Sequence, residues 1–272
     1  MRSFRIALLV LLSLAQPASA TTRPAKTAAR GAAGRMVTIP AGSYRPLYAI
    51  DGNERVSVAR FTIDREPVTR RQFLSFVAAQ PEWRRDRVRP VFADAHYLDG
   101  WPSADATPSL LDQPATGVSW FAAKAYCAAQ DKRLPTVDEW EYVAAADGRE
   151  RDASSSSRRR QRLLAMYASI RDARRHPAIG GDENVYGVRA LHGVVWEWTL
   201  DFNSVVVADD SRVVGGGNDA RDHHLYCASA SIGATDPSDF PAFVRYAVRA
   251  GLTARSATGT LGFRCAADAP QS

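Results

Sequence analysis

The sequence has no apolar stretch long enough to cross a membrane. Its longest apolar run, residues 6–14, has about nine residues, whereas a spanning helix needs roughly 20. Arg2 and Arg5 precede this run, and the small residues 18–20 follow it. That order is typical of a secretory signal peptide. We therefore expect cleavage after Ala20 and a periplasmic or secreted mature protein without a membrane span.

Residues 21–35 have little that could form a hydrophobic core, because Ala, Thr, Pro, Gly and Arg dominate them. Such a composition predicts an unstructured linker. It also argues against the alternative to a signal peptide, which is a buried N-terminal helix. The remaining stretch, residues 36–268, is long enough for one large domain, and a hydrophobic content of 46% supports a core.

No nucleic-acid-binding motif is present, although the formal net charge is +6. Much of the basic excess lies in one block, residues 149–162, so nucleic acid is not expected as a partner. We interpret this block as a solvated loop. An open alternative is that it attracts an acidic partner. Within the block, the Ser/Arg run at residues 154–160 predicts a mobile loop.

Cysteine is scarce, and the count is odd. The three cysteines are Cys127, Cys227 and Cys265. In an oxidising compartment this number suggests one disulfide and one free thiol. The spacing alone leaves all three pairings open.

Periodic segments are short and scattered, and no internal repeat is visible. Strands are predicted over residues 36–44 and 56–63, and helices over residues 68–77, over residues 119–129 and after Thr136. Thr69 and Ser119 are the expected caps of the first two helices, and Thr136 with Glu139 forms a capping box for the third. Long irregular stretches separate these segments and fill the C-terminal tail. This pattern predicts an irregular α+β domain with little regular secondary structure.

Six segments, in one order, carry a resemblance to a known family. They are residues 39–44 (IPAGSY), 63–76 (beginning IDREPVT), 114–140 (beginning PATGVSW), 184–187 (NVYG), 192–198 (HGVVWEW) and 261–266 (LGFRCA). Over residues 36–268 the chain resembles the sulfatase-modifying factor, or formylglycine-generating enzyme, family. The resemblance implies an irregular fold related to C-type lectins.

The resemblance also implies a disulfide pairing. In the family, the cysteine of the A-x-x-Y-C helix is bonded to the cysteine of the terminal G-F-R-C segment. Those positions are Cys127 and Cys265 here, which leaves Cys227 unpaired. The alternative is that Cys127 and Cys265 are both buried free thiols.

In the family, two cysteines about five residues apart follow a G-G-S turn and bind Cu(I), which thiolates favour. Here Asn218 stands at the serine of the turn, and Arg221 at the first cysteine. Only Cys227 lies near the second cysteine position. Copper held by two thiolates is therefore not expected, and neither is formylglycine generation itself.

Other residues are assigned to the site through the same resemblance. Cys227, His223 and Trp196 are the candidate catalytic group, with His223 and its neighbour His224 as possible nitrogen ligands of a mixed site. Asn218, Arg221, Arg245 and Arg249 are the candidate substrate-binding residues, in a region that also contains Asp236, Asp239 and Tyr246. The alternatives are an ordinary histidine pair in a loop and a structural network of salt bridges.

A structural calcium site is a further implication. Glu197 matches a calcium-binding carboxylate of the family, and the carbonyl groups of Ala190, Gly193 and Val195 would complete part of the ligand set. Calcium takes six to eight oxygen ligands, so these four are a partial set. Val194 replaces the asparagine of the family, and the second calcium site of the family is expected to be absent.

Two functions follow from the sequence. The first is a divergent exported oxidoreductase or maturation factor that acts on a periplasmic peptide or secondary-metabolite substrate. The second is a non-catalytic ligand- or protein-binding module on the same lectin-like fold. An enzyme should lose activity on Cys227→Ala or His223→Ala, whereas a binding module should tolerate both changes.

Overall fold

The computed structural model describes residues 34–48, 55–103, 106–170, 179–203 and 234–269. The predicted signal peptide and most of the predicted linker lie outside these ranges, so both stay predictions. In the part of the chain that is described, no helix is long and apolar enough to cross a membrane.

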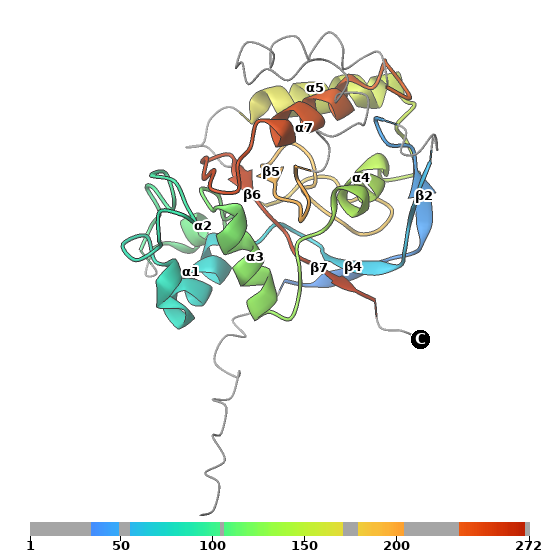
Figure 1. Cartoon of the computed structure of the whole chain (residues 1–272). Helices are drawn as coiled ribbons and strands as arrows, with labels where there is room; N and C mark the ends of the chain where they lie inside the picture. Colours follow the sequence, from blue (N-terminus) through green and yellow to red (C-terminus); the bar gives the residue numbers. More distant parts are fainter. Residues whose placement is uncertain (1–33, 49–54, 104–105, 171–178, 204–233, 270–272) are drawn as a thin grey trace, which may run out of the picture.

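Three small sheets organise the strands. The first has the antiparallel order β1 (Met36–Ile39), β4 (Phe61–Asp64), β7 (Ala266–Asp268); the second pairs β2 (Gly42–Tyr44) with β3 (Val56–Val58); the third pairs β5 (Trp196–Glu197) in parallel with β6 (Leu261–Gly262). Ile63 in the central strand pairs with Val37 on one side and with Ala266 on the other. The C-terminal strand therefore completes a sheet begun at the start of the domain (Figure 1).

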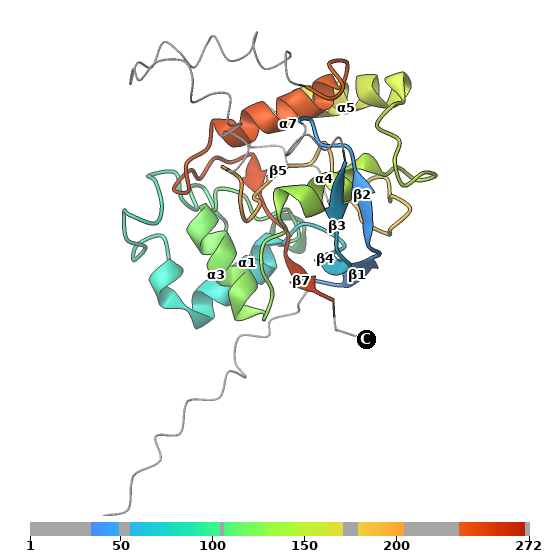
Figure 2. The ribbon, with the colours of Figure 1, turned by 45° about the vertical axis from the view of Figure 1, so that its right-hand side comes forward.

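Each predicted strand is divided in two. The first breaks after Ile39, where Pro40 lacks the N–H that would continue the ladder. The resulting β2–β3 pair stands beside helix α4 (Val137–Ala145) and above the three-stranded sheet (Figure 2).

The predicted caps mark the starts of three helices. α1 (Arg70–Ala79), α3 (Trp120–Ala129) and α4 begin after Thr69, Ser119 and Thr136, respectively. Each hydroxyl accepts a hydrogen bond from the backbone N–H three residues later, which satisfies one of the free donors of the first turn. The short helices η2 (Pro81–Trp83) and α2 (Pro108–Leu111) interrupt the long stretch predicted to be irregular.

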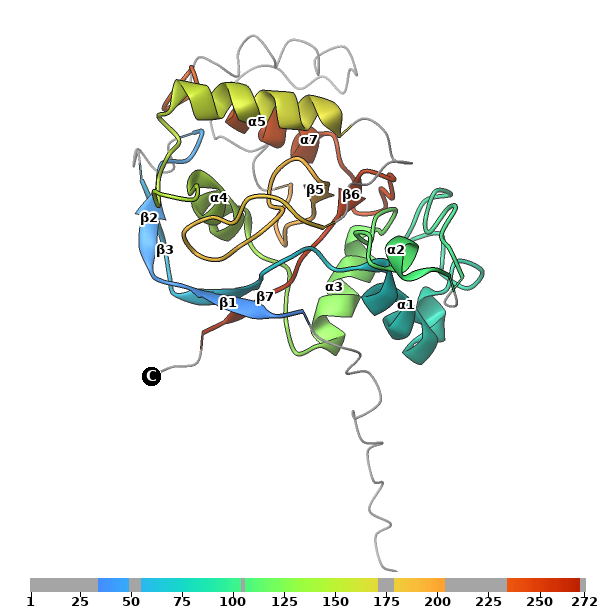
Figure 3. The same ribbon diagram turned by 180° about the vertical axis from the view of Figure 1, so that it is seen from behind.

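Two helices contradict the sequence predictions. The predicted mobile loop at residues 154–160 runs into α5 (Ser157–Ser169), whose buried side chains Leu163 and Tyr167 pack inward. The tail predicted to be irregular contains α7 (Phe240–Ala250), capped by Asp239. These helices lie side by side over α4 and β5 (Figures 1 and 3). Both errors have one cause, since the helices are stabilised by packing against each other and against the core.

The basic block is also less solvated than predicted. Arg159 donates to the carbonyl oxygens of Ala144 and Ala146 at 2.5 and 3.1 Å. Arg160 forms an ion pair with Asp236 at 2.6 Å. Part of the block therefore joins α5 to neighbouring segments.

The core contains a disulfide between Cys127 on α3 and Cys265 before β7, the pair implied by the family resemblance. Their Cα atoms lie 5.6 Å apart, and both residues are fully buried. The rings of Phe73, Tyr126 and Phe263 pack together in the same cluster. The bond thus links the segment before β7 covalently to α3.

Candidate functional site

A buried ion pair lies at the centre of the domain, between Glu197 on β5 and Arg264 just after β6. Both side chains are fully buried. Arg264 Nε donates to the two Glu197 oxygens at 3.0 and 2.8 Å, and its Nη2 donates to Oε1 at 2.8 Å. Trp140 Nε1 donates to Oε2 at 2.8 Å. Protein donors therefore satisfy both oxygens of the carboxylate.

The same guanidinium also donates hydrogen bonds to backbone carbonyl groups of two other segments. Arg264 Nη1 donates to the oxygens of Asp64 and Arg65 at 3.2 and 3.1 Å. Its Nη2 donates to those of Arg189 and Ala190 at 3.0 and 3.2 Å. Arg264 thus joins the end of β4, the 189–190 segment and β5 through one side chain.

These contacts do not fit the predicted calcium site. Of the four predicted ligands Ala190, Gly193, Val195 and Glu197, the carboxylate and the Ala190 carbonyl already accept hydrogen bonds from Arg264. A dication placed there would share the carboxylate with a guanidinium that repels it. The presence of calcium stays a prediction.

A second buried cluster centres on Glu141 of α4. Arg245 donates from Nε to both carboxylate oxygens at 3.0 Å and from Nη2 at 2.6 Å, and Arg249 donates from Nη1 at 2.5 Å. Burial by itself raises the pKa of Glu141, but the two guanidinium groups outweigh it and lower that pKa to about 2. The two arginines predicted to bind substrate are thus ion-paired inside the protein.

Hydrogen bonds continue from this cluster to a histidine. Arg245 Nη1 donates to Tyr167 Oη at 3.1 Å, and Tyr167 Oη lies 2.8 Å from His192 Nδ1. His192 Nε2 lies 3.2 Å from the oxygen of Ala144, which can only accept, so Nε2 carries the proton. Burial, with added repulsion from Arg245 and Arg159, lowers the pKa of His192 to about 3. His192 is therefore neutral at physiological pH.

The neutral histidine makes stability depend on pH. The unfolded chain binds a proton at His192 near pH 6.5, whereas the folded chain binds it only near pH 3. The contribution of His192 to the free energy of unfolding is complete above pH 6.5. It is lost as the pH falls toward 3, at about 1.4 kcal/mol per pH unit. Relative to His192→Gln, we expect wild type to lose about 2 kcal/mol more unfolding free energy between pH 7 and pH 5. Urea unfolding measures this, and equal losses in the two proteins would contradict a neutral His192.

Several predicted site residues meet around one small cavity between β5 and α7. Trp196, Glu197, Arg245 and Arg249 all line it. The Trp196 and Tyr167 rings lie 5.0 Å apart. The volume, about 20 Å³, is enough for a single water molecule. The structure therefore brings these residues together around one small space.

The other predicted site residues, Asn218, Arg221, His223 and Cys227, lie outside the described ranges, as does His224. Their roles and their distance from Trp196 stay predictions. The disulfide nevertheless constrains the chemistry, because it uses two of the three cysteines in the sequence. One chain then has a single cysteine left outside this bond, Cys227, and the absence of a two-thiolate copper site stays a prediction.

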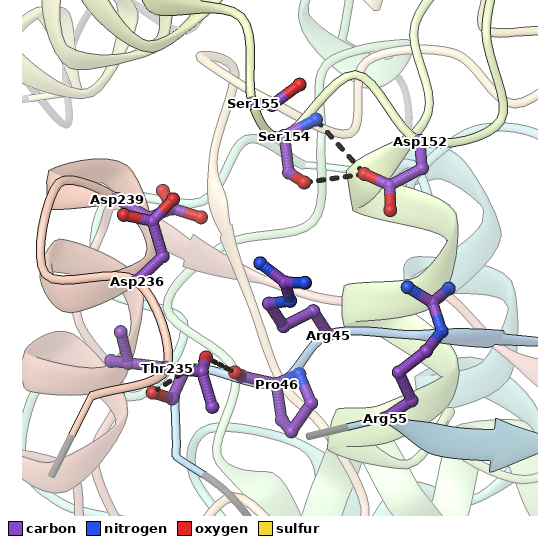
Figure 4. A pocket seen from close by; sticks show the side chains of 10 residues that line it. Arg45, Pro46, Arg55, Asp152, Ser154, Ser155, Thr235, Asp236 and Asp239 are labelled. Atoms are coloured by element: carbon purple, nitrogen blue, oxygen red, sulfur yellow. Dashed lines mark hydrogen bonds between the residues drawn. The ribbon is translucent and has the colours of Figure 1, made fainter.

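A larger cavity of about 220 Å³ opens between the β2–β3 pair and the start of α7 (Figure 4). Its charged lining residues are Arg45, Arg55, Asp152, Asp236 and Asp239, and we call it the arginine–aspartate cavity. The sequence prediction placed the last two in the region of the substrate groove and missed the others. No local signal connects them, since they come from three distant segments.

Comparison with protein-family models identifies one family. The model of the sulfatase-modifying factor enzyme 1-like domain matches residues 21–269. The inactive C-alpha-formylglycine-generating enzyme 2 of Mus musculus is 29% identical over 86% of each chain. The hercynine oxygenase of Mycolicibacterium smegmatis is 30% identical over 62% of this chain, which spans only 46% of that relative. The solved structure of PvdO from Pseudomonas aeruginosa matches with 21% identity and a TM-score of 0.45, covering 87% of this chain and 95% of that one. The chain belongs to the family of sulfatase-modifying factors, the formylglycine-generating enzyme family.

Proposed function

We propose that this chain is an exported ligand-binding member of the family that does not generate formylglycine. The observation that carries the proposal is the Glu141 cluster. A substrate carboxylate or phenolate that approached Arg245 or Arg249 would have to displace a buried carboxylate bound to both. The adjoining cavity has room for about one water molecule. The arginines support the fold there, which leaves ligand recognition to another part of the surface.

Export is part of this proposal. The disulfide supports it, because such bonds persist in oxidising compartments such as the periplasm and are rare in the cytosol. The basic, apolar and small-residue order of the first 20 residues supports it independently. Similarity to a relative named as inactive is in keeping with a binding role.

The second candidate is a divergent oxidoreductase or maturation factor acting on a periplasmic peptide or secondary metabolite. Cys227 favours it, because the disulfide leaves this cysteine without an intramolecular partner. Similarity to a relative named as an oxygenase also favours it. Under this hypothesis Cys227, His223 and Trp196 surround the substrate, and the chemistry does not use a pair of thiolates.

Product analysis tests the proposal that the chain does not generate formylglycine. We would incubate the purified protein with Cu(I), oxygen and a Cys-x-Pro-x-Arg peptide, beside an active formylglycine-generating enzyme as positive control. We expect no aldehyde by mass spectrometry and no oxygen uptake above that of Cys227→Ala. Aldehyde formation would overturn the proposal, and oxygen uptake that Cys227→Ala and His223→Ala abolish would establish the second candidate.

A further inference from the structure

The arginine–aspartate cavity has a floor made by backbone pairing. Thr235 N donates to the oxygen of Leu47 at 2.9 Å, and its hydroxyl donates to the oxygen of Pro46. Tyr48 and Ala234 form an antiparallel bridge beside these bonds. The segment after β2 is thus joined directly to the segment that leads into α7, which fixes one side of the cavity relative to the other.

One wall of the cavity is cationic. Arg55 donates from Nε to Ser43 Oγ at 3.0 Å and from Nη2 to the Ser43 carbonyl at 2.8 Å, and both acceptors are neutral. Arg45 points into the cavity in Figure 4 and has no hydrogen bond or ion pair with any described residue. Within the described ranges, neither guanidinium is paired with a carboxylate. Both charges are therefore available to a ligand.

The facing wall is anionic. Asp152 accepts from the backbone N–H and hydroxyl of Ser154 at 3.1 and 2.5 Å, and Asp239 accepts from Ala242 N at 3.1 Å. Neither carboxylate forms an ion pair with a described residue. Asp236 is different, because Arg160 neutralises it at 2.6 Å. The unpaired charges on this wall are thus those of Asp152 and Asp239.

Arg160 holds the parts of this wall together. It donates from Nε to the Ser154 carbonyl at 2.8 Å and also bonds to the Ser238 hydroxyl. One α5 side chain therefore connects the loop before α5 to the segment before α7. With the backbone floor, this keeps two guanidinium groups and two carboxylates facing one cavity without touching.

We propose that the arginine–aspartate cavity binds a small dipolar ligand, an amino-acid-like molecule with a carboxylate at one end and an ammonium group at the other. The carboxylate would pair with Arg45 and Arg55, and the ammonium group with Asp152 and Asp239. Charged hydrogen bonds of this kind give both affinity and orientation. A volume of about 220 Å³ is below the usual range for drug-sized ligands and suits a molecule of this size. The inference rests on the proposed binding function and identifies its ligand class.

Calorimetric titration of the purified protein tests the ligand class. The dipolar probes are glycine, 3-aminopropionate, 4-aminobutyrate, 6-aminohexanoate and glycylglycine, and the matched single-charge probes are butyrate and butylammonium. We expect at least one dipolar probe to bind about tenfold more tightly than both single-charge probes. The preferred chain length reports the separation of the two walls, and binding of glycylglycine alone would identify a peptide source. Absence of dipolar preference would overturn the inference.

Variants locate the binding. Arg45→Gln and Asp239→Asn should each weaken the best dipolar probe about tenfold, and asparagine preserves the cap of α7. Arg60→Gln is the matched control, because Arg60 is exposed and does not line the cavity. It should change affinity by less than about twofold. Equal effects of Arg45→Gln and Arg60→Gln would overturn the assignment to this cavity.

The two proposals fail in different ways. Aldehyde formation on the cysteine peptide would overturn the proposed function, whatever the titrations give. Loss of dipolar preference, with no aldehyde formed, would overturn only the ligand class. If the arginines and aspartates paired directly and closed the cavity in solution, no probe would bind. This result would also count against the inference.

Discussion

Replacing Cys127 and Cys265 together by alanine is expected to lower the free energy of unfolding by about 5 kcal/mol. The two positions are 138 residues apart in sequence, so the bond removes much of the conformational freedom of the unfolded chain. A loss of this size approaches the whole stability of many domains. We therefore expect the double variant to be largely unfolded at 37 °C.

Urea unfolding of the oxidised wild type and the double variant measures this loss. Cys227→Ala is the control, because it leaves the bond in place. Thiol titration of the denatured protein should find one free thiol in wild type and three after reduction. A similar loss of stability in Cys227→Ala, or three free thiols before reduction, would contradict the pairing of Cys127 with Cys265.

Arg264→Leu is expected to cost about 3–5 kcal/mol of unfolding free energy. The change leaves Glu197 fully buried without a counter-charge, and it leaves four backbone carbonyls without the donor they share. The exposed pair Arg71–Asp112 provides the matched control. Arg71→Leu should cost less than about 1 kcal/mol, because water and salt screen exposed pairs.

Two further measurements isolate the contribution of the buried ion pair. The double variant Arg264→Leu with Glu197→Leu should recover part of the loss, because no buried charge is then left alone. A calcium chelator should leave the unfolding free energy of wild type unchanged if Arg264 alone neutralises Glu197. A drop on chelation would show that a cation shares this carboxylate, and equal costs for Arg264→Leu and Arg71→Leu would contradict the role of the buried pair.

The helix caps show which features of this fold are encoded locally. Thr69, Ser119 and Thr136 each bond to a backbone N–H only three residues away, so the signal and its partner lie in one short segment. Local composition gave a wrong prediction for the Ser/Arg run at residues 154–160, which runs into α5. There the composition suggested a loop, but Leu163 and Tyr167 face apolar partners that come from other parts of the chain.

The candidate site was only partly accessible to sequence reasoning for the same reason. The family resemblance directed attention to Trp196, Arg245 and Arg249, and the structure places all three around one cavity. It did not indicate Glu141, which lies 104 residues from Arg245 in sequence and determines what both arginines bind. Nor did it indicate Arg264 as the partner of Glu197, 67 residues away. A charge on its own does not indicate whether it will meet a ligand or an opposite charge.

Membership of the family and the starts of the capped helices follow from residues read in order. Only the tertiary structure decided that Arg245 and Arg249 pair with Glu141 and that Arg264 pairs with Glu197. It also decided that the arginine–aspartate cavity is open. The physical reason is how far apart in the sequence the interacting residues lie. Caps act across one helical turn, whereas buried ion pairs and cavities depend on which distant segments the hydrophobic core brings within a few ångströms of each other.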